Sequence, residues 1–453
     1  NGKGESMTFE TKGKENNGAT YGRRSDWQDL YSIAKKYYEA LLADPGNALF
    51  HLTDPRGASD KSGRTFNNPY QYFFEQMHMD DAIYADESIY EYPMQQGGGN
   101  DGRPYSFGRP SSGGSKAAYP CKSYGQGRIN PAYFYGVFDP NDMRRDVSIT
   151  MTGSNGKGVE KLIPFVPNSK AEGGGLTLNK WDENRQANPW VAAQRKSGIN
   201  GPYMRMSEVY LGYAEVCAAL GDVVTGKQYL KTVRERSFPQ GLANTDAFIA
   251  SFGNDLVRAI IEERGFEYAG EGDRRWTLIR SGYLPEDIKR IKDMTKAMMD
   301  GLATKGYYEF ENGNIISAYI WTKLVDAKTI YGHRLTAQCP TDKVNDPVLY
   351  PGWRGQKDNW EEMGLNYGSS TPATNLAIKG LFEIVSEEEA ASLESQGYTK
   401  VNWGIDLVDN RDEYDKYLFW DYDYVSAPIY LWPFTPNVMA AGGFTNGYGF
   451  KQE

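Results

Sequence analysis

Apolar residues recur every three or four positions between residues 27 and 42, which is the spacing of one buried helix face. Ser25 or Asp26 can cap the start of this pattern, and the turn residues 44–47 (Asp-Pro-Gly-Asn) end it. The spacing therefore predicts a scaffold helix over 25–44. Its apolar positions are Trp27, Leu30, Tyr31, Ala34, Tyr37, Tyr38, Leu41 and Leu42.

The clearest helical periodicity lies between residues 202 and 301. Pro202 suits a first helical turn, and the turn Gly221-Asp222 ends the apolar pattern that follows it. Helix pairs joined by such a short turn are similar to tetratricopeptide hairpins. The sequence thus predicts a mainly α fold whose scaffold core spans 202–301 and consists of tetratricopeptide-like helix pairs. Further helices are expected at about 226–236, from Asp246 through Phe266, at 274–281 and from Pro285 to Asp300.

Residues 45–200 show no sustained period and carry glycine runs at 97–99 and 173–175. The apolar run Ala82–Tyr92 fits either a strand or a helix. Aromatic residues are too frequent here for a disordered segment, so we expect a long irregular excursion pinned onto the scaffold. Residues 1–24 predict a loop or a frayed start. Residues 302–453 predict a second loop-rich region, with short strands at 315–323 and 429–434 and a solvated helix at 384–397.

The charge balance excludes some classes of partner. The chain has 453 residues, a net charge of −9 and 40% hydrophobic residues, with a mean hydropathy of −0.64 and a pI of about 5.2. An acidic surface argues against nucleic acid and against loose adsorption to anionic lipid. No stretch approaches the ~18 apolar residues of a membrane span. The chain starts at Asn1, so we expect either a removed targeting segment or a start inside a longer protein.

No motif for cofactor or nucleophilic chemistry is present. The three cysteines and three histidines have no spacing typical of a zinc site, a disulfide framework or a catalytic pair. Oxygen-rich turns at 100–102 and 139–142 do not fit a calcium loop and are interpreted as ordinary turns. We therefore expect no metal, no cofactor and no catalytic residue.

Acidic residues on the predicted helices allow two interpretations. Glu208 and Glu215 lie seven apart, and Glu263 and Glu267 lie four apart, so each pair shares a helix face. A glycosidase needs two carboxylates across an open cleft, but arginines are in excess on the same helices. Since arginine pairs bidentately with carboxylate, structural ion pairs are the favoured interpretation. The predicted ion-pair set is Glu208, Glu215, Arg234, Arg236, Glu263, Glu267 and Arg275.

Tyrosine is abundant, with 33 residues, alongside 50 glycines. A tyrosine ring offers a flat apolar face and a polar tip, which suits recognition of a sugar ring. The alternative is that these rings only pack the loops, and both interpretations stay open. The candidate ligand contacts are Tyr105, Tyr119, Tyr124, Tyr133, Tyr135, Trp181 and Trp353.

Three stretches of the chain carry distinctive motifs: Tyr203–Glu215 with Leu220–Asp222 and Val233–Arg236, Ile261–Gly272 with Arg275-Trp276 and Leu278–Gly282, and Tyr430–Pro436 with Asn446–Tyr448. In their order and spacing, these stretches resemble motifs of the SusD/RagB family. Segments 26–43 and 82–94 fit the family more loosely, so the resemblance covers most of the chain. Thr277 stands where the family usually has Asp, which puts one salt bridge in question, and Phe434-Thr435 replaces Ile-Pro.

The resemblance implies one domain over 1–453 that lacks the N-terminal helical part and the lipidated cysteine of the family. It implies a lipoprotein of the outer membrane of Bacteroidota-like cells, exposed at the cell surface and capping a SusC-like TonB-dependent barrel transporter. Such a protein binds oligosaccharides and delivers them to the barrel for nutrient uptake, without catalysis. Three alternatives remain: an oligopeptide-binding RagB-like component, an α-rich glycoside hydrolase, and a lid with no ligand. Ligand-binding residues vary between members, so none is carried over.

Overall fold

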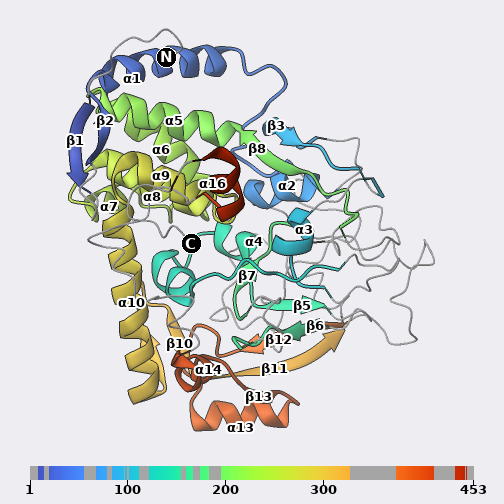
Figure 1. Ribbon diagram of the computed structural model, residues 1–453. Coiled ribbons are helices and arrows are strands. Elements are labelled where there is room, and N and C mark those ends of the chain that lie inside the picture. The colour runs from blue at the N-terminus through green and yellow to red at the C-terminus, as the bar shows by residue number, and fades with distance from the viewer. Residues whose placement is uncertain are drawn as a thin grey trace.

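A computed structural model describes residues 9–14, 20–55, 68–78, 84–95, 97–98, 102–111, 122–154, 160–166, 174–182, 195–326, 374–412, 434–443 and 445. In this part of the chain, most helices pack at one end of the molecule, and one long helix (Leu284–Lys305) runs along its side toward the other end (Figure 1). Short strands and loops fill much of the rest. The prediction of a mainly α fold with helix pairs and few short strands is confirmed. No helix among these residues is both long and apolar enough to cross a bilayer.

The scaffold begins with α1 (Trp27–Ala43), which lies along α5 (Met206–Ala219) at the top of the view in Figure 1. The two helices approach closely because α5 has Gly212 at the crossing, where an added Cβ would lie 2.3 Å from the Tyr38 hydroxyl. A tight turn then leads into α6 (Val223–Glu235), with Gly221 at a φ of +92°. Asp222 caps α6 by accepting a hydrogen bond from the Thr225 amide at 3.2 Å.

One predicted helix is in fact two. The pattern from Asp246 through Phe266 is divided into α7 (Thr245–Ala250) and α8 (Leu256–Glu267). Gly253 and Asn254 both adopt left-handed backbone conformations, which end the first helix. Asp255 then caps the second by accepting from the Arg258 amide at 3.0 Å. The scaffold continues with α9 (Asp273–Ser281) and α10 (Leu284–Lys305).

The predicted helix start at Pro202 is wrong. Residues Gly201–Arg205 form strand β8, which pairs antiparallel with β3 (Ser88–Tyr92) before α5 begins. The pairing with β3, a distant part of the chain, overrides the local preference for helix. Arg103 packs closely against Gly201, in the space that a Cβ there would occupy. The described part of residues 1–24 also differs from the prediction, since β1 (Phe9–Lys14) pairs antiparallel with β2 (Thr20–Arg24).

The excursion contains short elements that pack on the scaffold. Tyr70 illustrates the attachment, because its buried hydroxyl donates to the backbone carbonyl of Glu267 at 2.7 Å. The elements are α2 (Pro69–Gln76), α3 (Gly102–Phe107), the π-helix η1 (Tyr133–Val137), α4 (Arg144–Ser148), and the strand pairs β4 (Ile149–Thr150) with β7 (Thr177–Leu178) and β5 (Thr152–Ser154) with β6 (Glu160–Leu162).

The C-terminal region forms a small sheet at the opposite end from α1 (Figure 1). Its central strand β11 (Tyr319–Asp326) lies between β12 (Thr374–Lys379) and β13 (Thr399–Asn402), and β9 (Tyr307–Glu309) pairs with β10 (Ile315–Ser317). The expected solvated helix is α13 (Glu387–Ser395), and α14 (Gly404–Asp409) and α16 (Pro436–Gly442) follow. The strand expected at 429–434 lies outside the described residues except for Phe434.

The largest hydrophobic core joins the excursion to α10 and the C-terminal sheet. Trp403 is fully buried in it and donates through Nε1 to the Tyr135 hydroxyl at 2.9 Å. Phe134 and Phe382 stack in the same core, with ring centroids 5.6 Å apart. Segments that are distant in the sequence thus share one interior, which fixes the excursion against the scaffold.

Candidate functional site

A buried ionic network centred on Glu267 holds the scaffold to the excursion. Arg236 Nη2 lies 2.7 Å from Glu267 Oε1, and Arg144 Nη1 lies 3.0 Å from Glu267 Oε2. Arg205 also donates to Glu267, and Glu87 bridges Arg205 and Arg236. Burial alone would raise the pKa of Glu267, but Arg236, Arg205 and Arg144 together hold this pKa below its ordinary value.

The other predicted acidic residues also lie against guanidinium groups. Glu208 accepts from Arg264 Nη1 and Nη2 at 3.0 and 2.6 Å, as a bidentate pair. Glu215 forms a similar pair with Arg280, and the Tyr31 hydroxyl donates to it at 3.2 Å.

Glu263 completes the acidic set from the interior of α8. Its carboxylate lies 2.8 Å from Arg234 Nη1 and 2.7 Å from Arg144 Nη1. Glu263 and Glu267 are fully buried, so neither can meet a substrate in a cleft. The arrangement ties helices together rather than presenting a pair of open carboxylates.

Two residues on α9, Arg275 and Thr277, were also singled out from the sequence. Arg275 is half-buried. Thr277, where the sequence departs from the family pattern, is buried. Its hydroxyl donates to Asp273 Oδ2 at 2.9 Å and accepts from Arg264 Nε at 3.3 Å. The hydroxyl therefore occupies a place in the polar network beside the Arg264–Asp273 ion pair, which has a separation of 2.6 Å.

Three predicted ligand contacts instead pack the excursion. Tyr135 has no exposed surface, and Trp181 is 3% exposed, so no face of either ring is open to a sugar. The structure removes these two residues from the candidate ligand contacts, because core residues already cover them. Tyr133 is half-buried and donates through its hydroxyl to the Gly265 carbonyl at 2.8 Å, which attaches η1 to α8. Tyr119 and Trp353 lie outside the described residues.

Tyr105 and Tyr124 are brought together. Their rings meet edge to face at a centroid distance of 5.1 Å, and the Tyr124 amide donates to the Tyr105 carbonyl at 2.8 Å. Arg195 lies over the Tyr105 ring at 4.4 Å, and Lys122 lies over the Tyr124 ring at 4.6 Å. Both rings are only half-buried. This pair is a small, partly exposed aromatic cluster, and a cation lies over each of its two rings.

Three exposed tyrosines on the β3–β8 pair were missed from the sequence. Tyr90 and Tyr203 meet edge to face at 5.5 Å and are 55% and 76% exposed, and Tyr92 is 53% exposed. Arg103 on α3 lies 5.7 Å from the Tyr92 ring, and α3 also carries Tyr105. Figure 1 shows β3, β8 and α3 on the same side of the molecule. We call the five residues Tyr90, Tyr92, Tyr105, Tyr124 and Tyr203 the tyrosine strip.

One signal in the sequence could have pointed to the missed tyrosines. Tyr90 and Tyr92 flank Glu91, which is 4% exposed and accepts from Ser88 and from Asn200 on the segment before β8. An alternating Tyr-Glu-Tyr run next to a second tyrosine-bearing segment is compatible with a strand that has an aromatic outer face. The pairing of β3 with β8 was not visible locally.

The carboxylates of the oxygen-rich turn at 139–142 bind groups of the protein itself. Asp139 accepts from the Asn141 amide at 2.8 Å, and Asp142 pairs with Arg144 at 2.7 Å. Within the described ranges, no group of three or more His, Cys, Asp or Glu side chains is arranged to hold a metal ion. The turn at 100–102 lies mostly outside those ranges.

Comparison with known proteins gives one curated relative, a SusD-like protein of Formosa agariphila. It is 28% identical over 160 residues, which cover 35% of this chain and 26% of the relative. The chain therefore matches about a quarter of that relative's length.

Several solved structures are similar at low identity. A SusD homologue from Bacteroides thetaiotaomicron has a TM-score of 0.40 and 16% identity, over 62% of this chain and 56% of that one. Surface glycan-binding protein A from the same organism has a TM-score of 0.39 and 18% identity, over 58% and 52% of the two chains. That protein has also been solved in complex with laminarihexaose, and this structure gives a TM-score of 0.33 and 16% identity, over 58% and 52% of the two chains. The chain thus spans about half the length of these structures.

The family comparison is more extensive. The SusD family model matches residues 49–433, which include the ionic network, the β3–β8 pair and α3. Arg205, Arg236 and Glu267, which tie the scaffold together, all lie inside the matched range. The chain belongs to the SusD family.

Proposed function

We propose that this protein is the cell-surface glycan-binding component of a SusC-type nutrient importer, held at the outer membrane by a lipid anchor. In this role it captures oligosaccharides and delivers them to a TonB-dependent barrel, and it performs no catalysis. Family membership supports the general role. The observation that supports a glycan as ligand is the tyrosine strip.

The chemistry of the strip suits a sugar. Tyr90, Tyr92 and Tyr203 expose more than half of their surface, although large apolar rings are usually withdrawn from water. Their faces can cover the C–H side of a pyranose ring, while the phenol hydroxyls exchange hydrogen bonds with sugar hydroxyls. The edge-to-face contact of Tyr90 with Tyr203 holds both rings in place, which lowers the entropy lost on binding.

The test is binding of the full chain to a panel of soluble polysaccharides, by affinity electrophoresis and calorimetry. The variant Tyr90→Ala/Tyr203→Ala is expected to weaken binding of the polysaccharide that the wild type prefers by at least about tenfold, equivalent to about 1.4 kcal/mol. Tyr37→Ala is the matched control, because Tyr37 is 70% exposed on α1, away from the strip. Binding of oligopeptides alone would overturn the choice of glycan. Release of reducing ends from a polysaccharide would overturn the non-catalytic role.

The importer partner requires a separate experiment. The native protein is extracted from membranes of its source cells with mild detergent and purified through an antibody. A co-purifying large barrel protein, identified by mass spectrometry, is the expected result. Recovery in the aqueous fraction without any membrane protein would contradict both the partner and the outer-membrane location.

A further inference from the structure

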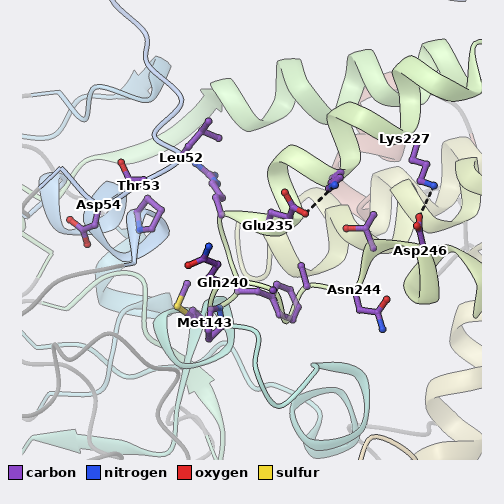
Figure 2. A pocket seen from close by; sticks show the side chains of 17 residues that line it. Leu52, Thr53, Asp54, Met143, Lys227, Glu235, Gln240, Asn244 and Asp246 are labelled. Carbon is purple, nitrogen blue, oxygen red and sulfur yellow. Dashed lines mark ion pairs between the residues drawn. The ribbon is translucent and has the colours of Figure 1, made fainter.

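A large pocket lies where the scaffold meets the excursion, on elements other than those of the tyrosine strip. It has a cavity volume of about 1030 Å³. Its walls come from the end of α6, the loop that leads to α7, the 52–54 segment and the start of α2 (Figure 2). We call it the junction pocket. Pockets that bury a drug-sized ligand have volumes of roughly 300–1,000 Å³, so this one has room for several sugar rings.

The charged groups in the wall are already matched to one another. Lys227 Nζ lies 2.6 Å from Asp246 Oδ1, and Lys231 Nζ lies 3.5 Å from Glu235 Oε1 (Figure 2). Asp54 accepts from the Asn68 amide at 3.0 Å. A charged ligand would have to compete with these contacts, and the wall has no excess of either sign to attract it.

The polar groups left over are neutral or are single donors. Thr245 is 6% exposed and its Oγ1 has no hydrogen-bond partner among the described residues. Arg236 is 4% exposed, and both of its Nη atoms bind carboxylates. Its Nε has no hydrogen-bond partner among the described residues. Buried donors and acceptors without partners are rare and costly in native proteins. Both belong to residues that line the pocket, but each atom has less than 1 Å² of exposed surface and so lies behind the wall, which leaves the neutral side chains at the wall surface to meet a ligand.

The pocket wall also has two amide side chains and several apolar side chains that can contact a ligand. Gln240 and Asn244 are exposed, and Asn244 caps α7 from a left-handed backbone conformation at a φ of +39°. Leu52, Pro239 and Met143 supply apolar surface beside these amides. Amides next to small apolar patches are the combination that a sugar ring requires.

We propose that the junction pocket is a second binding site, for a short uncharged oligosaccharide of two or three rings. The ligand's hydroxyls meet the Gln240 and Asn244 amides, and its C–H faces cover the apolar wall. The site is distinct from the tyrosine strip, since it is formed by α6, α7 and the segments facing them, whereas the strip lies on β3, β8, α3 and the loop that carries Tyr124. This inference does not depend on glycan capture by the strip.

The experiment uses the full chain carrying Tyr90→Ala/Tyr203→Ala, so that strip binding is weakened. The probes are maltotriose, laminaritriose and xylotriose as neutral ligands, with trigalacturonate and trialanine as charged comparisons, measured by calorimetry and saturation-transfer NMR. One neutral trisaccharide is expected to bind. Thr53→Trp, at an exposed wall position, should weaken it by at least about tenfold, and Gln240→Ala, which removes hydrogen bonds to a neutral ligand, by about threefold or more.

Matched controls separate the pocket from general damage. Thr304→Trp and Gln228→Ala alter side chains of the same kind on α10 and α6 that do not line the pocket, and they should leave binding unchanged. The proposal is overturned if no neutral trisaccharide binds, or if Thr53→Trp and Gln240→Ala bind as well as the controls. It is also overturned if trigalacturonate or trialanine binds more tightly than every neutral probe. None of these results changes the outcome of the polysaccharide test on the strip.

Discussion

Arg236, which caps the end of α6, reaches Glu267 on α8 with Nη2 2.7 Å from Oε1, and both side chains are withdrawn from solvent. The same Glu267 receives Arg205 from the end of β8 and Arg144 from α4. One carboxylate therefore joins the helical scaffold, the β3–β8 pair and the excursion. The tyrosine strip lies on segments held by this junction, so its geometry depends on the network although the network meets no ligand.

Removing the charge of Glu267 should destabilise the whole fold. In Glu267→Gln, three buried guanidinium groups lose a carboxylate that faces them, and breaking a buried ion pair from one side costs about 3–5 kcal/mol. The expected result is a loss of that order in the free energy of unfolding, measured by urea denaturation followed by circular dichroism. Asp300→Asn is the control, because Asp300 pairs with Arg411 on the exposed surface and should contribute little.

A loss in Glu267→Gln no greater than in the control would contradict the framework role. In that case the surrounding carboxylates, mainly Glu87 and Glu263, would be sufficient partners for the arginines.

The pH dependence of stability should follow the same group. The pKa of Glu267 is lower in the folded protein than in the unfolded chain, because the three arginines outweigh the effect of burial. Its contribution is therefore fully present above the unfolded pKa of about 4.5 and is lost as the pH falls below that value toward the folded pKa, since the unfolded state then binds more protons.

The measurement is thermal unfolding between pH 6 and pH 3. The midpoint should fall steeply below about pH 4.5 in the wild type. Glu267→Gln should show a shallower fall in that range, starting from a lower midpoint. Parallel curves for the two proteins would show that other carboxylates carry the acid sensitivity.

The scaffold was predictable where local periodicity decides the structure. The helix at 27–43 and the helix pair joined by Gly221-Asp222 could be predicted, because their apolar faces and turn residues lie close together in the sequence. Strand β8 was missed because its partner β3 lies more than a hundred residues earlier in the chain. The division between α7 and α8 was missed because Asn254 adopts a left-handed conformation that helical periodicity does not reveal.

The site was less predictable than the scaffold for the same reason. The glutamates of the network were identified, but Glu87 and Arg144 were not, although Glu87 meets Arg236 across 149 positions of sequence. Tyrosine content pointed to an aromatic surface, yet composition could not separate the buried Tyr135 from the exposed Tyr203. Exposure is set by long-range packing, which a single sequence shows only indirectly.

The contact between α1 and α5 gives a prediction about packing. A Cβ on Gly212 would lie 2.3 Å from the Tyr38 hydroxyl and 2.4 Å from the adjoining ring carbon. Gly212→Ala should therefore force the two helices apart and cost about 1–3 kcal/mol of unfolding free energy. Tyr38→Leu, which removes the ring atoms that clash, should recover part of this loss in the double variant.

A double-mutant cycle measures that coupling. The expected interaction energy is favourable and larger than about 0.5 kcal/mol, because the two positions touch. Additive effects of the two single changes would show that α1 does not lie against α5 at Gly212. Gly301 on α10 provides a matched site elsewhere, because an added Cβ there would lie 2.6 Å from the ring of Tyr308 on β9.

The paired rings of Tyr105 and Tyr124 allow stacking to be separated from hydrogen bonding. Tyr105→Phe keeps the ring that Arg195 covers at 4.4 Å and removes only the hydroxyl. Tyr105→Ala removes both the ring and its edge-to-face contact with Tyr124. If the ring supports the ligand, Tyr105→Ala should weaken polysaccharide binding by about three- to tenfold, whereas Tyr105→Phe should stay within about twofold of the wild type. Calorimetry with the polysaccharide preferred by the wild type makes the comparison, and equal losses in both variants would assign the contribution of Tyr105 to its hydroxyl.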